Sequence, residues 1–157
     1  AYIGDGNNVC NSLIMACAKT GVDLSIATPS GYEPSAQYVG LGREACKISE
    51  AKLTLTSSPK EAVQGAQVVY TDTWVSMGQE EESAKRLQDF AGYQINEDLV
   101  RLADKDYIFM HCLPAHRGQE VSAGVIDGPH SAIFDEAENR LHVQKAILIF
   151  LYTSKHN

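Results

Sequence analysis

Residues 1–27, AYIGDGNNVCNSLIMACAKTGVDLSIA, contain the pattern from which the fold class can be predicted. It opens with a short apolar run, turns at 5–8, and continues to Thr20 with apolar residues at helical spacing. Gly21 follows as a typical helix end, and a second apolar run, 23–29, comes next. A strand, a helix and a strand in this order form a βαβ unit, which predicts two parallel strands in one sheet.

The same alternation continues to the end of the chain. Further strands are expected at 52–57, 67–73 and 107–113, with a sixth at 130–135, and helices at 35–48, 58–66, 80–90, 96–103 and 136–152. Asp135 and Glu138 have the spacing of a capping box at the start of the last helix. The alternation predicts an α/β fold of three layers, αβα, with a mostly parallel sheet of about five strands. Ligands bind such sheets beyond the carboxyl ends of the strands.

Length and charge narrow the possible partners. The 157 residues suffice for one domain with a real core. A net charge of −7 disfavours nucleic acid and anionic membranes as main partners. No apolar run approaches the roughly 20 residues of a membrane span, and the turn-rich start lacks the basic residues of a signal peptide. The four cysteines form no CxxC motif, so we expect reduced thiols in a cytosol-like compartment.

The turn after the first strand carries Gly4 and Gly6, a pattern that also opens dinucleotide-binding sites. The NAD fingerprint requires glycine or alanine where this chain has Val9. It also requires an acidic residue at the end of the second strand, where Thr28 and Pro29 stand. The sequence therefore disfavours NAD, and no other cofactor is expected.

Two asparagines, Asn7 and Asn8, stand at the N-terminus of the first helix. Side-chain amides beside the free backbone N–H groups of a helix start suit a carboxylate or a phosphate. One asparagine is expected to cap the helix. The other is then available to a ligand.

The stretch after the fourth strand, TDTWVSMGQEEE, is the most specific feature of the chain. Asp72 at the strand's carboxyl end can pair with a substrate ammonium, and Ser76 and Met77 offer a hydroxyl and an adaptable apolar wall. Alternatively, Asp72 only forms the turn and Met77 only fills the core. The acidic run 80–82 is interpreted as a solvated helix start, favoured by the helix dipole.

The stretch HCLPAHRG follows the fifth strand and places His111, Cys112 and His116 close together in the sequence. On a strand His111 and Cys112 point to opposite faces, so they cannot easily share one metal ion, and we expect no metal. A thiol nucleophile needs a fixed base, for which His116 is the candidate. The alternative is that Cys112 lines a pocket beside the carbonyl of Leu113.

Together, DGNN, ATPSGYEP, TDTWVSMGQEEE, HCLPAHRG and DEAENR closely resemble the C-terminal, ornithine-binding half of the ornithine carbamoyltransferases. The resemblance extends from Tyr2 to about Tyr152 and implies a Rossmann-like domain over 1–157. It implies transfer of the carbamoyl group of carbamoyl phosphate to the δ-amine of L-ornithine, giving citrulline and phosphate. The family's N-terminal carbamoyl-phosphate domain is expected to be absent from this chain.

The resemblance also assigns roles to individual residues. Asn8 matches the asparagine that binds the ornithine carboxylate, Asp72 the acid that holds its ammonium, and Ser76 and Met77 the loop over ornithine.

Cys112 and Leu113 match the pair near the carbamoyl carbon and the reacting amine. Carbamoyl phosphate binding is expected at Cys112, Leu113 and Arg140, and Cys112 and Arg140 are the expected catalytic residues. Arg140 matches an arginine that reaches the carbamoyl phosphate oxygen, where it would stabilise charge that grows in the transition state. Its alternative role is a helix pair with Glu136.

Further expectations follow from the missing half. The parent is expected to be a trimer or larger, in the cytoplasm, or in the mitochondrial matrix if a transit peptide precedes this chain. The run AILIFLY, 146–152, is apolar on every face of its helix, so we expect it to be packed on both sides. The absent domain is the expected partner on the far side. Without that domain we expect no turnover. The alternatives are a carbamoyltransferase for another amine, such as putrescine or N-acetylornithine, and a non-catalytic amino-acid-binding module.

Overall fold

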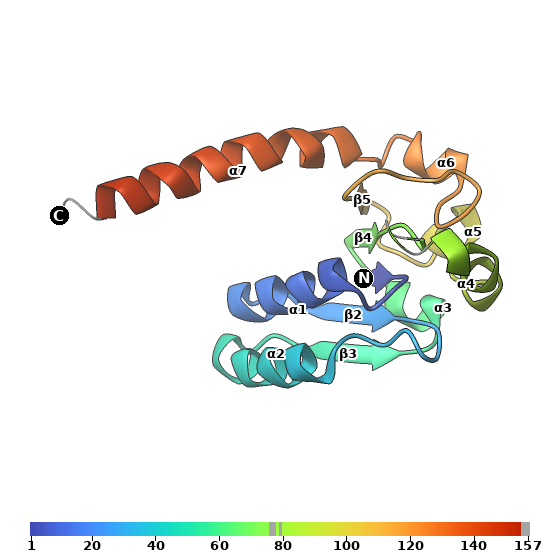
Figure 1. Ribbon diagram of the computed structural model, residues 1–157, viewed down its shortest axis with the longest axis horizontal. Coiled ribbons are helices and arrows are strands. Elements are labelled where there is room, and N and C mark those ends of the chain that lie inside the picture. Colours follow the sequence, from blue (N-terminus) through green and yellow to red (C-terminus); the bar gives the residue numbers. More distant parts are fainter. Residues whose placement is uncertain (76–77, 79, 155–157) are drawn as a thin grey trace.

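The computed structural model describes residues 1–75, 78 and 80–154. Five parallel strands form one sheet in the order β3-β2-β1-β4-β5 (Figure 1). The strands are β1 (Tyr2–Ile3), β2 (Leu24–Ala27), β3 (Leu53–Thr56), β4 (Val68–Thr71) and β5 (Ile108–His111). The predicted α/β fold with a parallel sheet of about five strands is confirmed.

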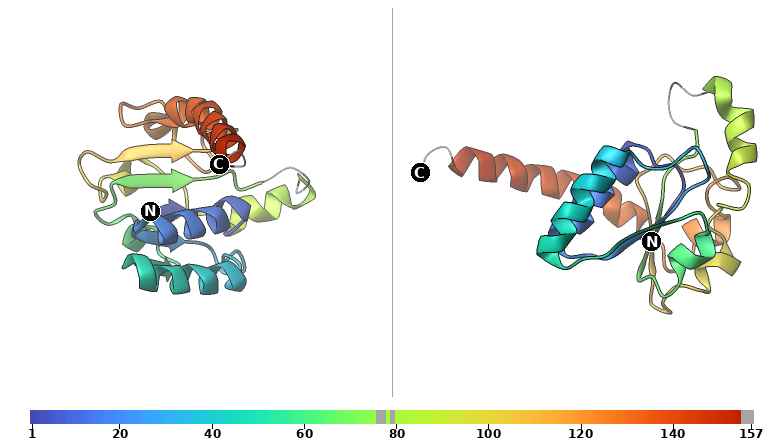
Figure 2. Two further views of the ribbon diagram at one scale, coloured as in Figure 1. Left: turned by 90° about the vertical axis from the view of Figure 1, so that its left-hand side faces the viewer. Right: turned by 90° about the horizontal axis from the view of Figure 1, so that it is seen from below.

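The helices cover both faces of the sheet (Figure 2). They are α1 (Asn8–Thr20), α2 (Ala36–Ser49), α3 (Pro59–Val63), α4 (Ser83–Asp89) after a 3-10 turn η1 (Glu80–Glu82), α5 (Glu97–Val100), α6 (Ala123–Ile126) and α7 (Ile133–Ser154). The helices α1 and α2 pack together on one face, whereas α3 and α5 lie on the other.

The core consists of two layers that start from neighbouring residues of β1. Tyr2 packs with Cys10 and Ile14 of α1, whereas Ile3 packs with Phe109 and Val121 on the opposite face. Successive side chains of a strand point to opposite faces, so the two-residue strand β1 supplies one fully buried side chain to each layer. The sheet is therefore buried on both sides, as the near-continuous apolar strands require.

Local signals place the end of α1 and the start of α3 where the sequence predicts them. Gly21 ends α1 in the left-handed conformation, with φ 78°, which glycine adopts at little cost. The Ser58 side chain caps α3, and Pro59 occupies its first turn.

The prediction for 130–135 is wrong. This segment forms a single bridge, from Ser131 to Phe109, instead of a sixth strand. The chain then enters α7 at Ile133, so Asp135 and Glu138 lie inside the helix and form no capping box at its start. Two backbone bonds to Phe109 hold this crossing, from its N–H to His130 and from Ala132 to its carbonyl. One rung of pairing is too short to extend the sheet.

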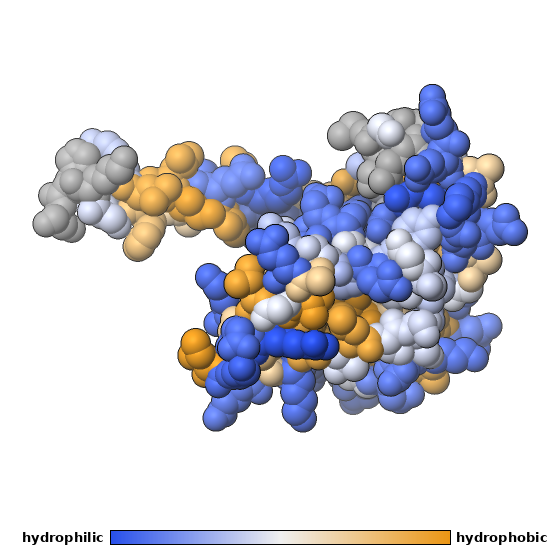
Figure 3. All heavy atoms as spheres, turned by 60° about the horizontal axis from the view of Figure 1, so that its bottom comes forward, coloured by the Kyte–Doolittle hydropathy of each residue, from blue (hydrophilic) through white to orange (hydrophobic). Residues whose placement is uncertain are grey.

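Helix α7 leaves the body of the domain (Figure 1). Of its residues only Ile133 is buried, and Phe134, Leu148 and Phe150 are each at least 67% exposed. Figure 3 shows the hydrophobic residues on the projecting part of the helix, beyond a hydrophilic stretch nearer the body. The predicted exposed apolar surface is thus present. Within the described part of the chain no helix combines the length and apolar character needed to cross a membrane.

Candidate functional site

A cleft of about 660 Å³ lies between α1 and the first turns of α7 and reaches the carboxyl end of β5. Its polar and reactive groups come from four parts of the chain. They are Asn8, Ser12, Tyr70, Cys112, Glu136 and Arg140, and Leu113 lines the cleft beside Cys112. The family resemblance assigns seven residues to substrates, and five of them lie at or next to this cleft. Asn8, Cys112, Leu113 and Arg140 line it, and Asp72 accepts a hydrogen bond from Cys112.

One of the two asparagines caps the first helix, as the sequence predicts. Asn7 caps α1, since its side-chain oxygen accepts from the N–H groups of Val9 and Cys10 at 3.1 and 3.4 Å. Its amide nitrogen also donates to Asp72 at 2.8 Å. Asn8 is exposed and lines the cleft. Asn8 is therefore the asparagine available to a ligand.

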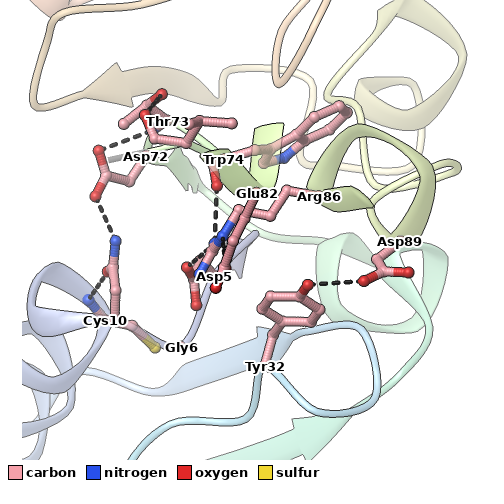
Figure 4. A network of polar contacts seen from close by, with 12 residues as sticks. Asp5, Gly6, Cys10, Tyr32, Asp72, Thr73, Trp74, Glu82, Arg86 and Asp89 are labelled. Atoms are coloured by element: carbon pink, nitrogen blue, oxygen red, sulfur yellow. Dashed lines mark hydrogen bonds and ion pairs between the residues drawn. The ribbon is translucent and has the colours of Figure 1, made fainter. Parts of the chain in front are cut away.

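Asp72 is more enclosed than an open ammonium anchor would be. The residue is 6% exposed, and its two side-chain oxygens accept three bonds. Figure 4 shows Asp72 with its bond from Thr73. One oxygen accepts from Thr73 N–H at 2.8 Å and from the Cys112 thiol at 3.0 Å, and the other accepts from Asn7. A carboxylate has about four acceptor positions, so one position remains for a ligand ammonium.

The Cys112 thiol is held in its protonated form. Burial and the hydrogen bond to Asp72 raise the pKa of Cys112 to about 12. His116, the candidate base, lies instead beside Thr73, with 3.3 Å between Nδ1 and Oγ1. A nucleophilic cysteine needs a lowered pKa and an adjacent base. This geometry favours the interpretation in which Cys112 lines a pocket.

Glu136 anchors the start of α7. One carboxylate oxygen accepts from the Tyr70 hydroxyl at 2.5 Å, and the other accepts from the backbone N–H of His111 at 2.9 Å. Arg140, one turn later, is exposed at the cleft. Among the residues that the structure describes, Arg140 forms no ion pair, so the alternative pairing with Glu136 is not made. Its guanidinium is available to an anionic ligand.

A buried ion pair near the site was missed from the sequence. Arg86 of α4 is 6% exposed, and its Nη1 donates to Asp5 at 2.6 Å and to the carbonyl of Trp74 at 2.9 Å (Figure 4). Glu81 and Glu82 are exposed, as the interpretation of a solvated helix start requires, whereas Arg86 in the helix that follows is buried. Glu82 also pairs with Arg86 at 3.4 Å, one helical turn apart, but no sequence signal distinguishes this arginine from a surface one.

Two of the predicted site residues cannot be placed in the cleft. Ser76 and Met77, assigned to the loop over ornithine, lie outside the described residues. Within 1–75, 78 and 80–154, no three histidine, cysteine or acidic side chains are grouped in a way that could hold a metal ion. All four cysteines are free thiols.

In α/β proteins, small molecules bind in clefts at the carboxyl edge of a parallel sheet, and this chain has such a sheet and such a cleft. Residues 1–151 match the family model described as "Aspartate/ornithine carbamoyltransferase, Asp/Orn binding domain". The chain belongs to the aspartate/ornithine carbamoyltransferase family.

Individual relatives agree with this assignment. The chain is 57% identical over 151 residues to an ornithine carbamoyltransferase of Caldicellulosiruptor saccharolyticus, covering 96% of the chain and 49% of the relative. It is also 57% identical over 152 residues to that of Geobacillus stearothermophilus, covering 95% and 48%.

Solved structures of the family match as well. The ornithine carbamoyltransferase of Pyrococcus furiosus superposes with a TM-score of 0.89 at 51% identity, over 94% of this chain and 47% of that one. The anabolic enzyme of Campylobacter jejuni gives 0.93 at 44% identity, over 98% and 50%. The chain thus spans about half the length of the relatives it matches.

Proposed function

We propose that this chain is the ornithine-binding half of an ornithine carbamoyltransferase. The whole enzyme would transfer the carbamoyl group of carbamoyl phosphate to the δ-amine of L-ornithine, giving L-citrulline and phosphate. The observation that carries the proposal is the cleft in which Asn8, Cys112, Leu113 and Arg140 come together from three distant parts of the sequence. These are the positions that the family resemblance assigns to the two substrates.

The charges around the cleft suit a zwitterionic amino acid next to an anion. The Asn8 amide can donate to the ornithine carboxylate at the start of α1, where backbone N–H groups also favour negative charge. The Asp72 carboxylate can accept from the ornithine ammonium. Arg140 brings the positive charge that carbamoyl phosphate needs. Ornithine would then lie with its head group held and its δ-amine directed to the carbamoyl carbon.

The reaction needs a neutral δ-amine and a fixed approach to the carbamoyl carbon. Holding both reactants in one site converts a bimolecular step into an effectively unimolecular one. Arg140 would stabilise the oxygen on which negative charge grows as the C–N bond forms. The protonated Cys112 thiol contributes a hydrogen-bonding wall to the pocket, and the carbamoyl group passes directly to the amine without a covalent enzyme intermediate.

We further propose that α7 is covered in the whole enzyme by the carbamoyl phosphate-binding domain. Nine large apolar residues between Phe134 and Tyr152 are at least 51% exposed, and a contiguous exposed apolar surface of this kind marks an interaction site. Arg140 projects from the same helix at the cleft. Docking a second domain along α7 would therefore both bury the apolar surface and close the site around Arg140.

The proposal is tested by titrating ornithine, putrescine, lysine and aspartate into the chain and into the whole enzyme, with and without carbamoyl phosphate. Ornithine is expected to bind the whole enzyme best and to be converted to citrulline. The chain alone is expected to form no citrulline. Turnover by the chain alone would contradict the two-domain site, and preference for aspartate would contradict the assignment of the amine.

Asp72 and Asn8 favour ornithine over the alternative amines. Putrescine has no carboxylate for Asn8, and in N-acetylornithine the ammonium that Asp72 would hold is acetylated. A site built to hydrogen-bond a head group discriminates strongly against a substrate that lacks it. The same titration separates an enzyme from a non-catalytic amino-acid-binding module, because only the enzyme releases phosphate from carbamoyl phosphate when ornithine is added.

A further inference from the structure

We propose that His111 and Glu120 form a buried positioning pair that holds the Cys112–Leu113 turn in the shape that receives carbamoyl phosphate; this inference rests on the proposed function. Both side chains are fully buried, with 0% exposure. Neither lines the cleft, whereas the two residues that follow His111 do. The pair therefore acts on the turn and not on the substrate.

The first contact fixes the tautomer of His111. Its Nδ1 accepts from the backbone N–H of Leu113 at 2.9 Å, so Nδ1 carries no proton. The proton of the neutral ring is then on Nε2, which lies 3.2 Å from Glu120 Oε1. The imidazole thus connects the Leu113 amide to a buried carboxylate. The carboxylate fixes the ring orientation as the partner of a metal-bound or catalytic histidine does elsewhere.

The second contact brings the other side of the loop to the same carboxylate. Glu120 Oε1 also accepts from the backbone N–H of His116 at 2.5 Å. Glu120 Oε1 therefore holds the segment 112–116 on both sides of Pro114. Before Pro114 it acts through the His111 ring, which bonds to the Leu113 N–H, and after Pro114 it accepts directly from the His116 N–H. The other oxygen, Oε2, is buried without a hydrogen-bond partner in the described structure. A buried carboxylate that leaves one oxygen unpaired is costly, which indicates that its position serves a purpose.

The turn that the pair supports is conformationally unfavourable. Leu113 has φ 56°, a left-handed conformation that costs a non-glycine residue roughly 1–2 kcal/mol. Such residues persist when surrounding contacts over-determine them, and they concentrate at functional sites. The bond from the Leu113 N–H to His111 is the contact that restrains this residue. Without the pair, the turn would relax away from the geometry that places Leu113 at the cleft.

The same loop also touches the ornithine side of the site. His116 Nδ1 lies 3.3 Å from Thr73 Oγ1, and Thr73 follows Asp72 directly. Among the described residues, the side-chain hydrogen bonds of the pair reach only the loop 112–116, at the backbone of Leu113 and of His116. Cys112 also donates to Asp72, but Asp72 keeps its bonds from Asn7 and from the Thr73 N–H when the turn moves. Disturbing the pair should therefore affect carbamoyl phosphate more than ornithine.

The test compares two substitutions of Glu120 in the whole enzyme. Glu120→Gln keeps an oxygen that can accept both bonds, so kcat and both KM values should stay within about threefold of the wild type. Glu120→Leu has similar volume but accepts nothing. It should raise the KM for carbamoyl phosphate and lower kcat, reducing kcat/KM about tenfold or more, equivalent to about 1.4 kcal/mol. The KM for ornithine should stay within about threefold.

Val121→Ala is the matched structural control. Val121 is adjacent, has 0% exposure, and has no side-chain bond to the turn, so its truncation lowers Tm through a cavity without changing the KM for carbamoyl phosphate. A rise in that KM equal to the one in Glu120→Leu would show that any loss of core stability disturbs the site, and would overturn the positioning role.

A second measurement is independent of activity. Amide hydrogen exchange of this chain should show a protected Leu113 N–H in the wild type and in Glu120→Gln, and faster exchange in Glu120→Leu. Unchanged Leu113 exchange in Glu120→Leu would refute the pair's role even if the kinetics changed. If the whole enzyme makes no citrulline, the proposed function fails, while the exchange result still decides whether His111 and Glu120 hold the turn.

Discussion

Cys112 should resist alkylation, because its environment keeps the thiol protonated. The hydrogen bond from its sulfur to Asp72 and its burial raise its pKa from 9.0 to about 12. At pH 8 the thiolate fraction falls from about one in ten to about one in ten thousand, roughly a thousandfold decrease. A more basic thiolate is also more nucleophilic, by about 20-fold for this shift at a Brønsted slope of about 0.4–0.5. The net expectation is alkylation about 50-fold slower than at an ordinary cysteine.

The assay is iodoacetamide labelling followed by peptide mass spectrometry. The best reference is Cys112 in the urea-unfolded chain, where the same neighbours in sequence are present but the burial is lost. The labelling rate in the folded chain should rise about tenfold per pH unit from pH 8 to 10, without a plateau, because the pKa lies above this range.

Asp72→Asn provides the matched variant. It removes the negative charge beside the sulfur, so the pKa of Cys112 should fall and the labelling rate at pH 8 should rise. Equal labelling rates in the folded and unfolded wild-type chain would show that folding does not raise the pKa of Cys112. That result would favour the alternative in which Cys112 is a nucleophile.

Three further results are expected. Asn7→Ala should lower the free energy of unfolding by about 1–2 kcal/mol through loss of the α1 cap, whereas exposed Asn8→Ala should change it by less than about 0.5 kcal/mol; equal losses in urea titrations would contradict the division of roles. Arg86→Met should cost about 3 kcal/mol or more, because it leaves a buried carboxylate unpaired; a loss below about 1 kcal/mol in the same titration would contradict this. The exposed apolar surface of α7 should make the unmodified chain self-associate, and the double substitution Phe150→Lys with Tyr152→Lys should give a folded monomer in sedimentation. An unmodified chain that is already monomeric would show that this surface drives no association.

The sequence predicted the elements whose signals are local. Helix α1 begins at an asparagine cap and ends at Gly21, and α3 begins at Ser58 with Pro59 next. The βαβ alternation then suffices for a parallel sheet. The segment 130–135 misled because an apolar run of six residues fits both a strand and a buried helix start. Its outcome depends on Phe109, which offers it only one rung of pairing.

The candidate site was predictable only in part. Residues at strand ends, such as Asp72 and Cys112, follow from the rule that ligands bind beyond the carboxyl edge. The Asp5–Arg86 pair joins residues 81 positions apart, and no periodicity indicates such a contact. Glu120 looks like a surface acid in the sequence, since acidic residues are almost never fully buried. Only the folded loop shows that both histidines of HCLPAH meet its carboxylate.

A chimera can show whether this chain serves as the ornithine-binding half of a carbamoyltransferase. The Geobacillus stearothermophilus enzyme is 57% identical to this chain over 152 residues, which is 48% of its length. Replacing the matching part of that enzyme with this chain joins it to a natural partner half. Citrulline formation would then be measured with ornithine as the varied substrate. We expect a folded chimera with a kcat/KM for ornithine within about tenfold of the Geobacillus enzyme, and with activity abolished or greatly reduced by Arg140→Ala. A folded chimera that binds carbamoyl phosphate but forms no citrulline from ornithine would contradict the account.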